Sequence, residues 1–165
     1  MGIKELNQLK VVLYSYLFLM ALKGKLQGQF NNFYINKIKE MEKMNKFSER
    51  SKEKLKTVDI RLQNLMNVAI KESPYDFSIT EGIRTLKRQK ELVAQGKSKT
   101  LKSYHLTGKA VDIAVWINGK VTWDFKYYKE VANHIKEVAK RLGYVITWGG
   151  DWKTFKDGPH FQIEN

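Results

Sequence analysis

Hydrophobic side chains recur at helical intervals through much of the chain. Between Lys56 and Lys71 they lie three or four positions apart over most of the stretch, at Val58, Leu62, Leu65, Met66 and Ala69. This spacing predicts a helix with one buried face. Similar spacing predicts helices over residues 85–95 and 127–142.

Short apolar runs rich in β-branched and aromatic residues predict strands near residues 76–80, 110–117 and 144–147. The dipeptide Asn118-Gly119 separates two such runs and is a strong signal for a two-residue hairpin. Helices interleaved with a sheet that contains a tight hairpin predict an α+β fold with a largely antiparallel sheet.

The first 29 residues form an apolar segment of different character. Residues 11–22 carry no charge and are bounded by Lys10 and Lys23. A helix of that length spans about 18 Å, short of the roughly 30 Å of a bilayer core, so the run suits a secretory signal better than a full span. Three interpretations stay open: an uncleaved signal anchor, which we favour, a cleaved signal, or a buried or amphipathic helix.

Residues 30–46 are rich in Lys and Glu and are expected to form a charged helical linker. The folded domain is expected to begin near Phe47 and to span residues 47–165. The chain has no cysteine, which excludes disulfides and thiolate chemistry.

The net charge of +13 is shared by both parts of the chain, because residues 1–56 hold 12 basic against 5 acidic side chains and residues 57–165 hold 18 against 12. Such a field attracts polyanions, among them the anionic polymers of a cell envelope. Only five of the thirty basic residues are Arg, and no nucleic-acid-binding motif is present. We therefore expect no specific nucleic-acid partner.

Two of the three histidines suggest a metal site. His105 and His160 lie in Gly-containing, aromatic-rich segments, whereas His134 lies in a helical stretch and is expected to be structural. Catalytic zinc takes three nitrogen or oxygen ligands and keeps a position for water, and Asp112 would complete such a set. Asp157 would then remain as a base for hydrolysis.

The setting of the two acidic residues leaves alternatives open. Asp112 interrupts an apolar strand-like run, where a half-buried carboxylate needs a cation or hydrogen-bond donors, unless it lies on the solvated face of an edge strand. Asp157 and His160 flank Gly158-Pro159, a turn that would aim both side chains at one point, although Asp157 could instead only cap the turn.

The motifs in their order along the chain resemble those of the zinc peptidases of the D-alanyl-D-alanine carboxypeptidase group, and among them most closely the phage endolysins that cleave the L-alanyl-D-glutamate bond of peptidoglycan. The resemblance runs from about Lys46 to the C-terminus. Its motifs are Phe47-Ser48-Glu49-Arg50-Ser51, Thr80-Glu81-Gly82-Ile83-Arg84-Thr85, Gly96-Lys97-Ser98-Lys99-Thr100, Ser103-x-His105-x-x-Gly108-x-Ala110-x-Asp112, Trp148-Gly149-Gly150-Asp151-Trp152 and Asp157-x-Pro159-His160-Phe161.

The resemblance implies His105, Asp112 and His160 as zinc ligands, Asp157 as general acid and base, and Arg84 as the stabiliser of the oxyanion. It also implies a zinc cleft on an antiparallel sheet, in a fold of the D-Ala-D-Ala peptidase and hedgehog type. Three further residues are expected to contact substrate or support the ligands: Ser103, Trp148 and Asp151. Asp151 is expected to do so by bonding a ligating histidine.

We therefore expect a zinc peptidase that cuts the peptidoglycan stem peptide, with L-alanyl-D-glutamate as the expected bond. A D-alanyl-D-alanine carboxypeptidase and a non-catalytic wall-binding module are the alternatives. The expected location is the cell envelope, with anchoring by residues 11–22. A cytoplasmic protein released through a separate pore is the other possibility.

Overall fold

The computed structural model describes residues 16, 20 and 45–164. Contacts divide the chain into the units Met1–Lys43 and Met44–Asn165, and all elements given below belong to the second. The expected signal anchor at residues 11–22 and the linker at 30–46 fall almost entirely outside the described residues. Among the helices that are described, none is long and apolar enough to cross a membrane.

One antiparallel sheet organises the domain. Its strands are β1 (Asp76–Glu81), β2 (Ala110–Ile117), β3 (Lys120–Thr122), β4 (Ile146–Trp148) and β5 (His160–Ile163), in the order β1-β2-β5-β4 with β3 paired to β2. Every pairing is antiparallel, so the α+β fold predicted from sequence is confirmed. Strand β5 was not predicted, because its four residues carry too short a pattern to be recognised alone.

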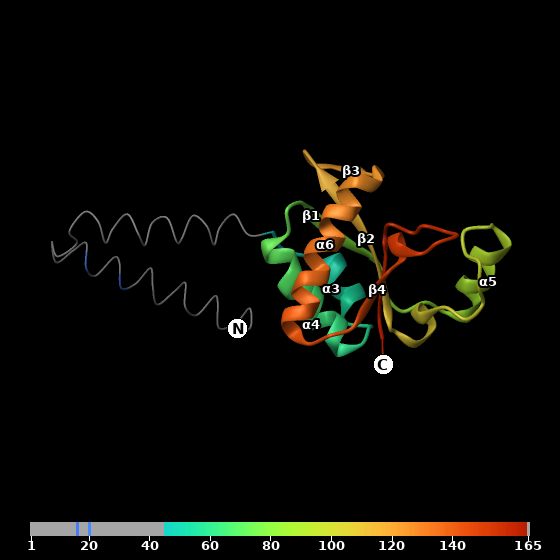
Figure 1. Cartoon of the computed structure of the whole chain (residues 1–165). Coiled ribbons are helices and arrows are strands. Elements are labelled where there is room, and N and C mark those ends of the chain that lie inside the picture. Colours follow the sequence, from blue (N-terminus) through green and yellow to red (C-terminus); the bar gives the residue numbers. More distant parts are fainter. Residues whose placement is uncertain (1–15, 17–19, 21–44, 165) are drawn as a thin grey trace. The chain divides into compact units, whose positions relative to one another are not determined.

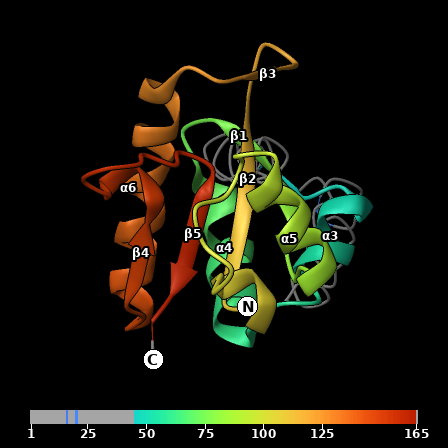
Figure 2. The same cartoon turned by 90° about the vertical axis from the view of Figure 1, so that its right-hand side faces the viewer.

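Four helices surround the sheet: α3 (Glu49–Leu55), α4 (Ile60–Glu72), α5 (Leu86–Ala94) and α6 (Phe125–Leu142). The helix expected from residue 56 begins instead at Ile60, because Asp59 caps it by accepting a hydrogen bond from the Arg61 amide. Figure 1 shows α4 and α6 on one side of the sheet and α5 on the other. Figure 2 looks onto the second side, where α5 and the loop after β4 flank β2.

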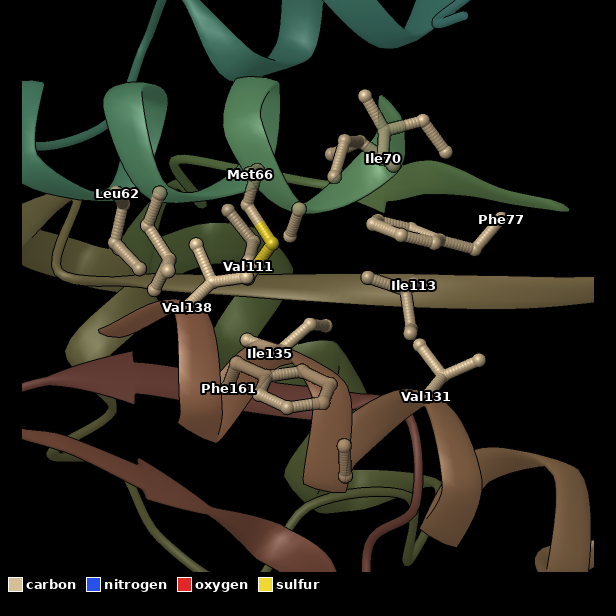
Figure 3. Packing of buried hydrophobic residues seen from close by; sticks show 14 of the residues in the cluster. Leu62, Met66, Ile70, Phe77, Val111, Ile113, Val131, Ile135, Val138 and Phe161 are labelled. Carbon is tan, nitrogen blue, oxygen red and sulfur yellow. The ribbon is translucent and has the colours of Figure 1, made fainter. Parts of the chain in front are cut away.

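Strand alternation separates the core from the opposite face. Val111 and Ile113 of β2 pack with Met66 of α4, Ile135 of α6 and Phe161 of β5, and all five are at most 1% exposed (Figure 3). Burying an aliphatic or aromatic side chain of this size contributes about 1.5–3 kcal/mol. Because successive side chains of a strand point to opposite faces, the intervening residues of β2 and β5 face the side of the sheet that carries α5.

The predicted hairpin is present between β2 and β3. Ile117 pairs with Lys120, and Asn118 and Gly119 both have positive φ angles, of 51° and 75°. Two consecutive positive φ angles match the type I′ turn that suits the twist of a hairpin. The hairpin carries Trp123 beside the cleft described below.

Candidate metal centre

Two candidate ligands lie on neighbouring strands. Asp112 of β2 and His160 of β5 are directly opposite each other in the antiparallel register. Because Val111 and Phe161 form the adjacent pair and point into the core, Asp112 and His160 project together to the other face. Strand β2 is central, so the alternative that Asp112 sits on a solvated edge strand is wrong.

The third candidate ligand comes from a 3₁₀ turn, η1 (Tyr104–Thr107), before β2. Ser103 caps this turn by accepting a hydrogen bond from the His105 amide, and Gly108 ends it in the left-handed conformation, with φ 67°. The Nδ1 atom of His105 lies 2.8 Å from the carbonyl oxygen of Gly82. This contact turns the Nε2 atom toward the sheet.

The three side chains converge on one point. His105 Nε2 lies 3.1 Å from Asp112 Oδ1 and 3.2 Å from His160 Nδ1, and His160 Nδ1 lies 3.2 Å from Asp112 Oδ1. Ligands that hold zinc tetrahedrally at 2.0–2.1 Å are about 3.3 Å apart. The triangle of atoms therefore has the size that such an ion requires.

The partners on the outer side of each imidazole show that a cation fits this triangle. The Nδ1 of His105 donates to the Gly82 carbonyl, and the Nε2 of His160 lies 3.2 Å from Gln162 Oε1 and donates to it in the matching tautomer. Each neutral ring then directs a lone pair at the centre of the triangle, where the Asp112 oxygen also points. Three converging acceptors repel one another unless a cation lies between them.

Burial and neighbouring charges shift the pKa values of Asp112 and His160. Burial on its own would raise the pKa of Asp112, but hydrogen bonds and charge from His105 and His160 hold it well below its usual range. Burial on its own would lower the pKa of His160, but the hydrogen bond and negative charge of Asp112 raise it above its usual value. The carboxylate is therefore ionised and ready to bind a cation.

Arg84 contacts the other oxygen of the Asp112 carboxylate. Its Nη2 donates to Asp112 Oδ2 at 3.2 Å and also to Glu81, while Nη1 donates to Gln89 Oε1 at 2.8 Å. A bulge in β1 brings Glu81 opposite Asp112, where regular pairing would have placed Thr80. The Arg84 side chain is only 8% exposed, and these contacts fix it against the candidate ligand.

Asp157 approaches the same site from the turn before β5. The amide of His160 donates to the Asp157 carbonyl at 3.3 Å, which confirms the expected turn. A Cβ atom at Gly149 would lie 2.6 Å from the Asp157 carbonyl oxygen and 3.1 Å from His160 Cβ, so only glycine permits this approach. Burial, followed by the negative charge of Asp112, raises the pKa of Asp157.

The three residues expected to contact substrate or support the ligands lie in different places: Ser103 in the cleft lining, Trp148 in the core and Asp151 on the surface. Ser103 lines the cleft and caps the turn that carries His105. Trp148 is 2% exposed and packs in the core, where its indole nitrogen donates to the Gly158 carbonyl at 2.7 Å. The exposed carboxylate of Asp151 pairs with Lys136, and the outer nitrogens of His105 and His160 have other partners, so within residues 45–164 the expected bond from Asp151 to a ligating histidine is not formed.

A cleft of about 630 Å³ lies over the cluster. Its lining includes all three candidate ligands together with Asp157 and Arg84. Aromatic side chains form part of its wall, with the Trp152 ring 5.1 Å from the ring of His160. A peptide bound here would therefore lie directly against the candidate metal ligands.

Sequence reasoning missed the groups that orient the ligands. Gly82 contributes a carbonyl, and Gln162, Glu81 and Gln89 contribute side chains that are chemically ordinary. The only available signal was the alternation in β5, which places Gln162 on the same face as His160. The other contacts depend on how distant segments pack.

Comparisons with known proteins agree on one family. The model of the phage L-alanyl-D-glutamate peptidase family matches residues 43–163. The L-alanyl-D-glutamate peptidase of Escherichia phage T5 is 38% identical over 116 residues, covering 68% of this chain and 85% of that protein. The peptidoglycan L-alanyl-D-glutamate endopeptidase CwlK of Bacillus subtilis (strain 168) is 40% identical over 103 residues, covering 53% of this chain and 60% of that protein.

A solved structure is also similar. The crystal structure of the Serratia marcescens L-Ala D-Glu endopeptidase ChiX aligns with a TM-score of 0.68 and 41% sequence identity. The alignment covers 73% of this chain and 91% of that one. The similarity thus extends over nearly the whole of the compared enzyme.

Proposed function

Because the chain belongs to the phage L-alanyl-D-glutamate peptidase family, we propose that it is a zinc-dependent endopeptidase that hydrolyses the bond between L-alanine and D-glutamate in peptidoglycan stem peptides. The observation that carries this proposal is the convergence of His105, Asp112 and His160 within a cleft large enough for a peptide. The relatives named above act on the same bond, according to their names.

Zinc is the ion that this ligand set suits best. Two imidazole nitrogens and one carboxylate oxygen form a usual ligand set of catalytic zinc, whereas magnesium and calcium prefer oxygen alone. When bound, zinc would polarise the scissile carbonyl group and lower the pKa of water. His105, Asp112 and His160 would hold the ion, and Gly82 and Gln162 would fix the two imidazoles.

Asp157 is the residue proposed to move protons. Its carboxylate would accept a proton from the attacking water and donate it to the amine nitrogen of D-glutamate as that group leaves. A carboxylate that accepts and then returns a proton works best when its pKa lies nearer the working pH, and burial raises the pKa of Asp157 in that direction. Gly149 keeps this residue beside His160.

Arg84 is proposed to act through Asp112. The sequence-based hypothesis gave it the role of stabilising the oxyanion, which requires donors that point at the substrate. Two of its nitrogens instead donate to Asp112, Glu81 and Gln89. We therefore assign Arg84 as a positioning residue that orients the carboxylate ligand.

The bond that is cut can be tested directly. The full chain would be incubated with purified peptidoglycan, and mass spectrometry would identify the newly formed ends. New amino termini on D-glutamate would support the proposal, whereas release of free D-alanine would identify the carboxypeptidase alternative. Binding to peptidoglycan without formation of new ends, by the wild type and by Asp157→Ala alike, would instead indicate a wall-binding module without catalysis. Loss of cleavage with a chelator and recovery on adding zinc would identify the ion.

The place of action follows from the substrate. The proposal puts the enzyme at the peptidoglycan, with a peptidase domain at residues 47–165 and attraction of its net charge of +13 to anionic envelope polymers. Residues 11–22 are proposed to anchor the chain at the inner membrane and thereby to deliver it. Separation of cell lysates into membrane and soluble fractions, with and without residues 1–29, would distinguish anchoring from release through a pore.

A further inference from the structure

We propose that Lys97, Lys99 and Lys102 form a cationic rim that binds the free carboxylate of the D-glutamate residue beside the scissile bond. The proposal rests on the function proposed above and specifies which part of the substrate the cleft recognises. The three lysines lie on residues 96–103, the segment between α5 and η1. All three side chains line the cleft that contains the candidate metal ligands.

Hydrogen bonds from a buried side chain of α5 fix the segment that carries the rim. Gln89 of α5 is fully buried, and its Nε2 donates to Ser98 Oγ at 2.8 Å and to the Thr100 carbonyl at 2.6 Å. Its Oε1 accepts from Arg84, which in turn contacts Asp112. One buried side chain thus connects the lysine segment to the candidate metal centre, so the rim has a defined position relative to the reacting bond.

The charges of the rim are available for a ligand. Lys97, Lys99 and Lys102 are exposed, and among residues 45–164 none of them forms an ion pair with a carboxylate. Lys99 Nζ lies 5.8 Å from the centre of the Phe155 ring, on another part of the cleft wall. Three cations around one cleft that have no carboxylate partner in the described part of the chain favour an anionic group there.

The substrate supplies such a group at the right place. A glutamate residue has two carboxyl groups, and only one of them continues the peptide chain. The other remains as a free anion within a few bonds of the nitrogen that leaves on hydrolysis. A lysine ammonium group is a compact point charge on a flexible stem, which allows it to reach a carboxylate without fixed geometry. The rim would therefore recognise the residue on the amine side of the bond.

A substrate pair separates this role from general attraction. Two soluble stem peptides would be compared, one with the free carboxylate of D-glutamate and one with that group converted to the amide. Each would be tested with the wild type, with K97Q/K99Q/K102Q, and with K120Q/K129Q/K140Q. The control lysines are exposed on β3 and α6, lie outside the cleft lining, and give the same change in net charge.

We expect the rim variant to lose roughly tenfold in kcat/KM on the free acid, since each exposed ion pair contributes up to about fivefold and the contributions overlap. The loss on the amide should be less than about twofold, and the control variant should match the wild type on both peptides. Equal losses on the two peptides, or no loss on the free acid, would overturn the proposal. If the wild type cleaves neither peptide between L-alanine and D-glutamate, the proposed function itself fails.

Discussion

Arg84 holds the outer oxygen of Asp112, while the inner oxygen faces the two histidines. The Nη2 atom lies 3.2 Å from Oδ2, and Oδ1 lies 3.1 Å from His105 and 3.2 Å from His160. One carboxylate therefore divides its two oxygens between a guanidinium group and the candidate metal centre. The effect of Arg84 on metal binding can therefore be measured through the zinc affinity of a variant that lacks its side chain.

Replacing Arg84 should weaken metal binding. In Arg84→Ala, Asp112 loses the donor that fixes its orientation, so zinc affinity should fall by about 10–100-fold. A competition titration against a chromophoric chelator measures this directly. Arg88→Ala, an exposed change on α5, should leave the affinity unchanged. Unchanged zinc affinity with a large loss of kcat in Arg84→Ala would restore the oxyanion role expected from sequence.

Replacing Asp157 should separate catalysis from metal binding. Asp157→Asn keeps the shape of the side chain but removes its capacity to accept a proton, so kcat/KM should fall by about 10²–10⁴-fold. Zinc affinity should stay within a few-fold of the wild-type value, because the three candidate ligands are intact. Asp151→Asn is the matched control, since that carboxylate is exposed and, among residues 45–164, forms an ion pair with Lys136 alone. A peptidase that works normally without the Asp157 carboxylate would refute the assignment.

Replacing Gly149 should show whether the close approach of Asp157 to the site is needed for activity. In Gly149→Ala the new Cβ would lie 2.6 Å from the Asp157 carbonyl oxygen, so the turn before β5 must shift. We expect a lower melting temperature together with a loss of activity of tenfold or more, because a displacement of about 1 Å is costly in an active site. Gly143→Ala is the control: it strains a residue with φ 71° at the end of α6, outside the cleft lining, and should lower stability without lowering kcat/KM. Full activity in Gly149→Ala would show that the approach is not required.

Zinc affinity should depend on pH through His160. Its pKa in the metal-free protein is raised above the usual value by Asp112, although burial alone would lower it. Because the metal needs the unprotonated ring, affinity is complete above this raised pKa and is lost as pH falls through it. Below it, affinity should drop by about tenfold per pH unit for each proton displaced. Calorimetric titrations between about pH 5 and 8 measure the slope, and His134→Gln should reproduce the wild-type curve.

Most of the fold and the identity of the candidate ligands could be predicted from the sequence. The predicted strand at residues 110–117 matches β2 in full, and helices at 85–95 and 127–142 match α5 and α6 within two residues, because their caps and apolar periods are local signals. The ligand set came from the residue types of two segments and from their resemblance to known motifs, and it could not come from periodicity, since His105 and His160 are 55 positions apart.

What sequence reasoning missed depends on contacts between distant segments. The carbonyl of Gly82 meets His105 across 23 positions, and Arg84 meets Asp112 across 28. Asp151 was expected to bond a ligating histidine because the second ring nitrogen of a metal-bound histidine commonly has such a partner. The 3₁₀ turn η2 (Gly149–Asp151) instead leaves its carboxylate exposed beside Lys136 of α6.

The alternation of β2 and β5 also protects the site against misalignment. If β5 moved by one residue along β2, Phe161 would turn toward water and the imidazole of His160 would be forced among Val111 and Ile135. The apolar face of the sheet thus disfavours a slip of one residue, which would place the imidazole of His160 and the carboxylate of Asp112 on opposite faces. Core packing therefore selects the strand register that keeps Asp112 and His160 on the same face of the sheet.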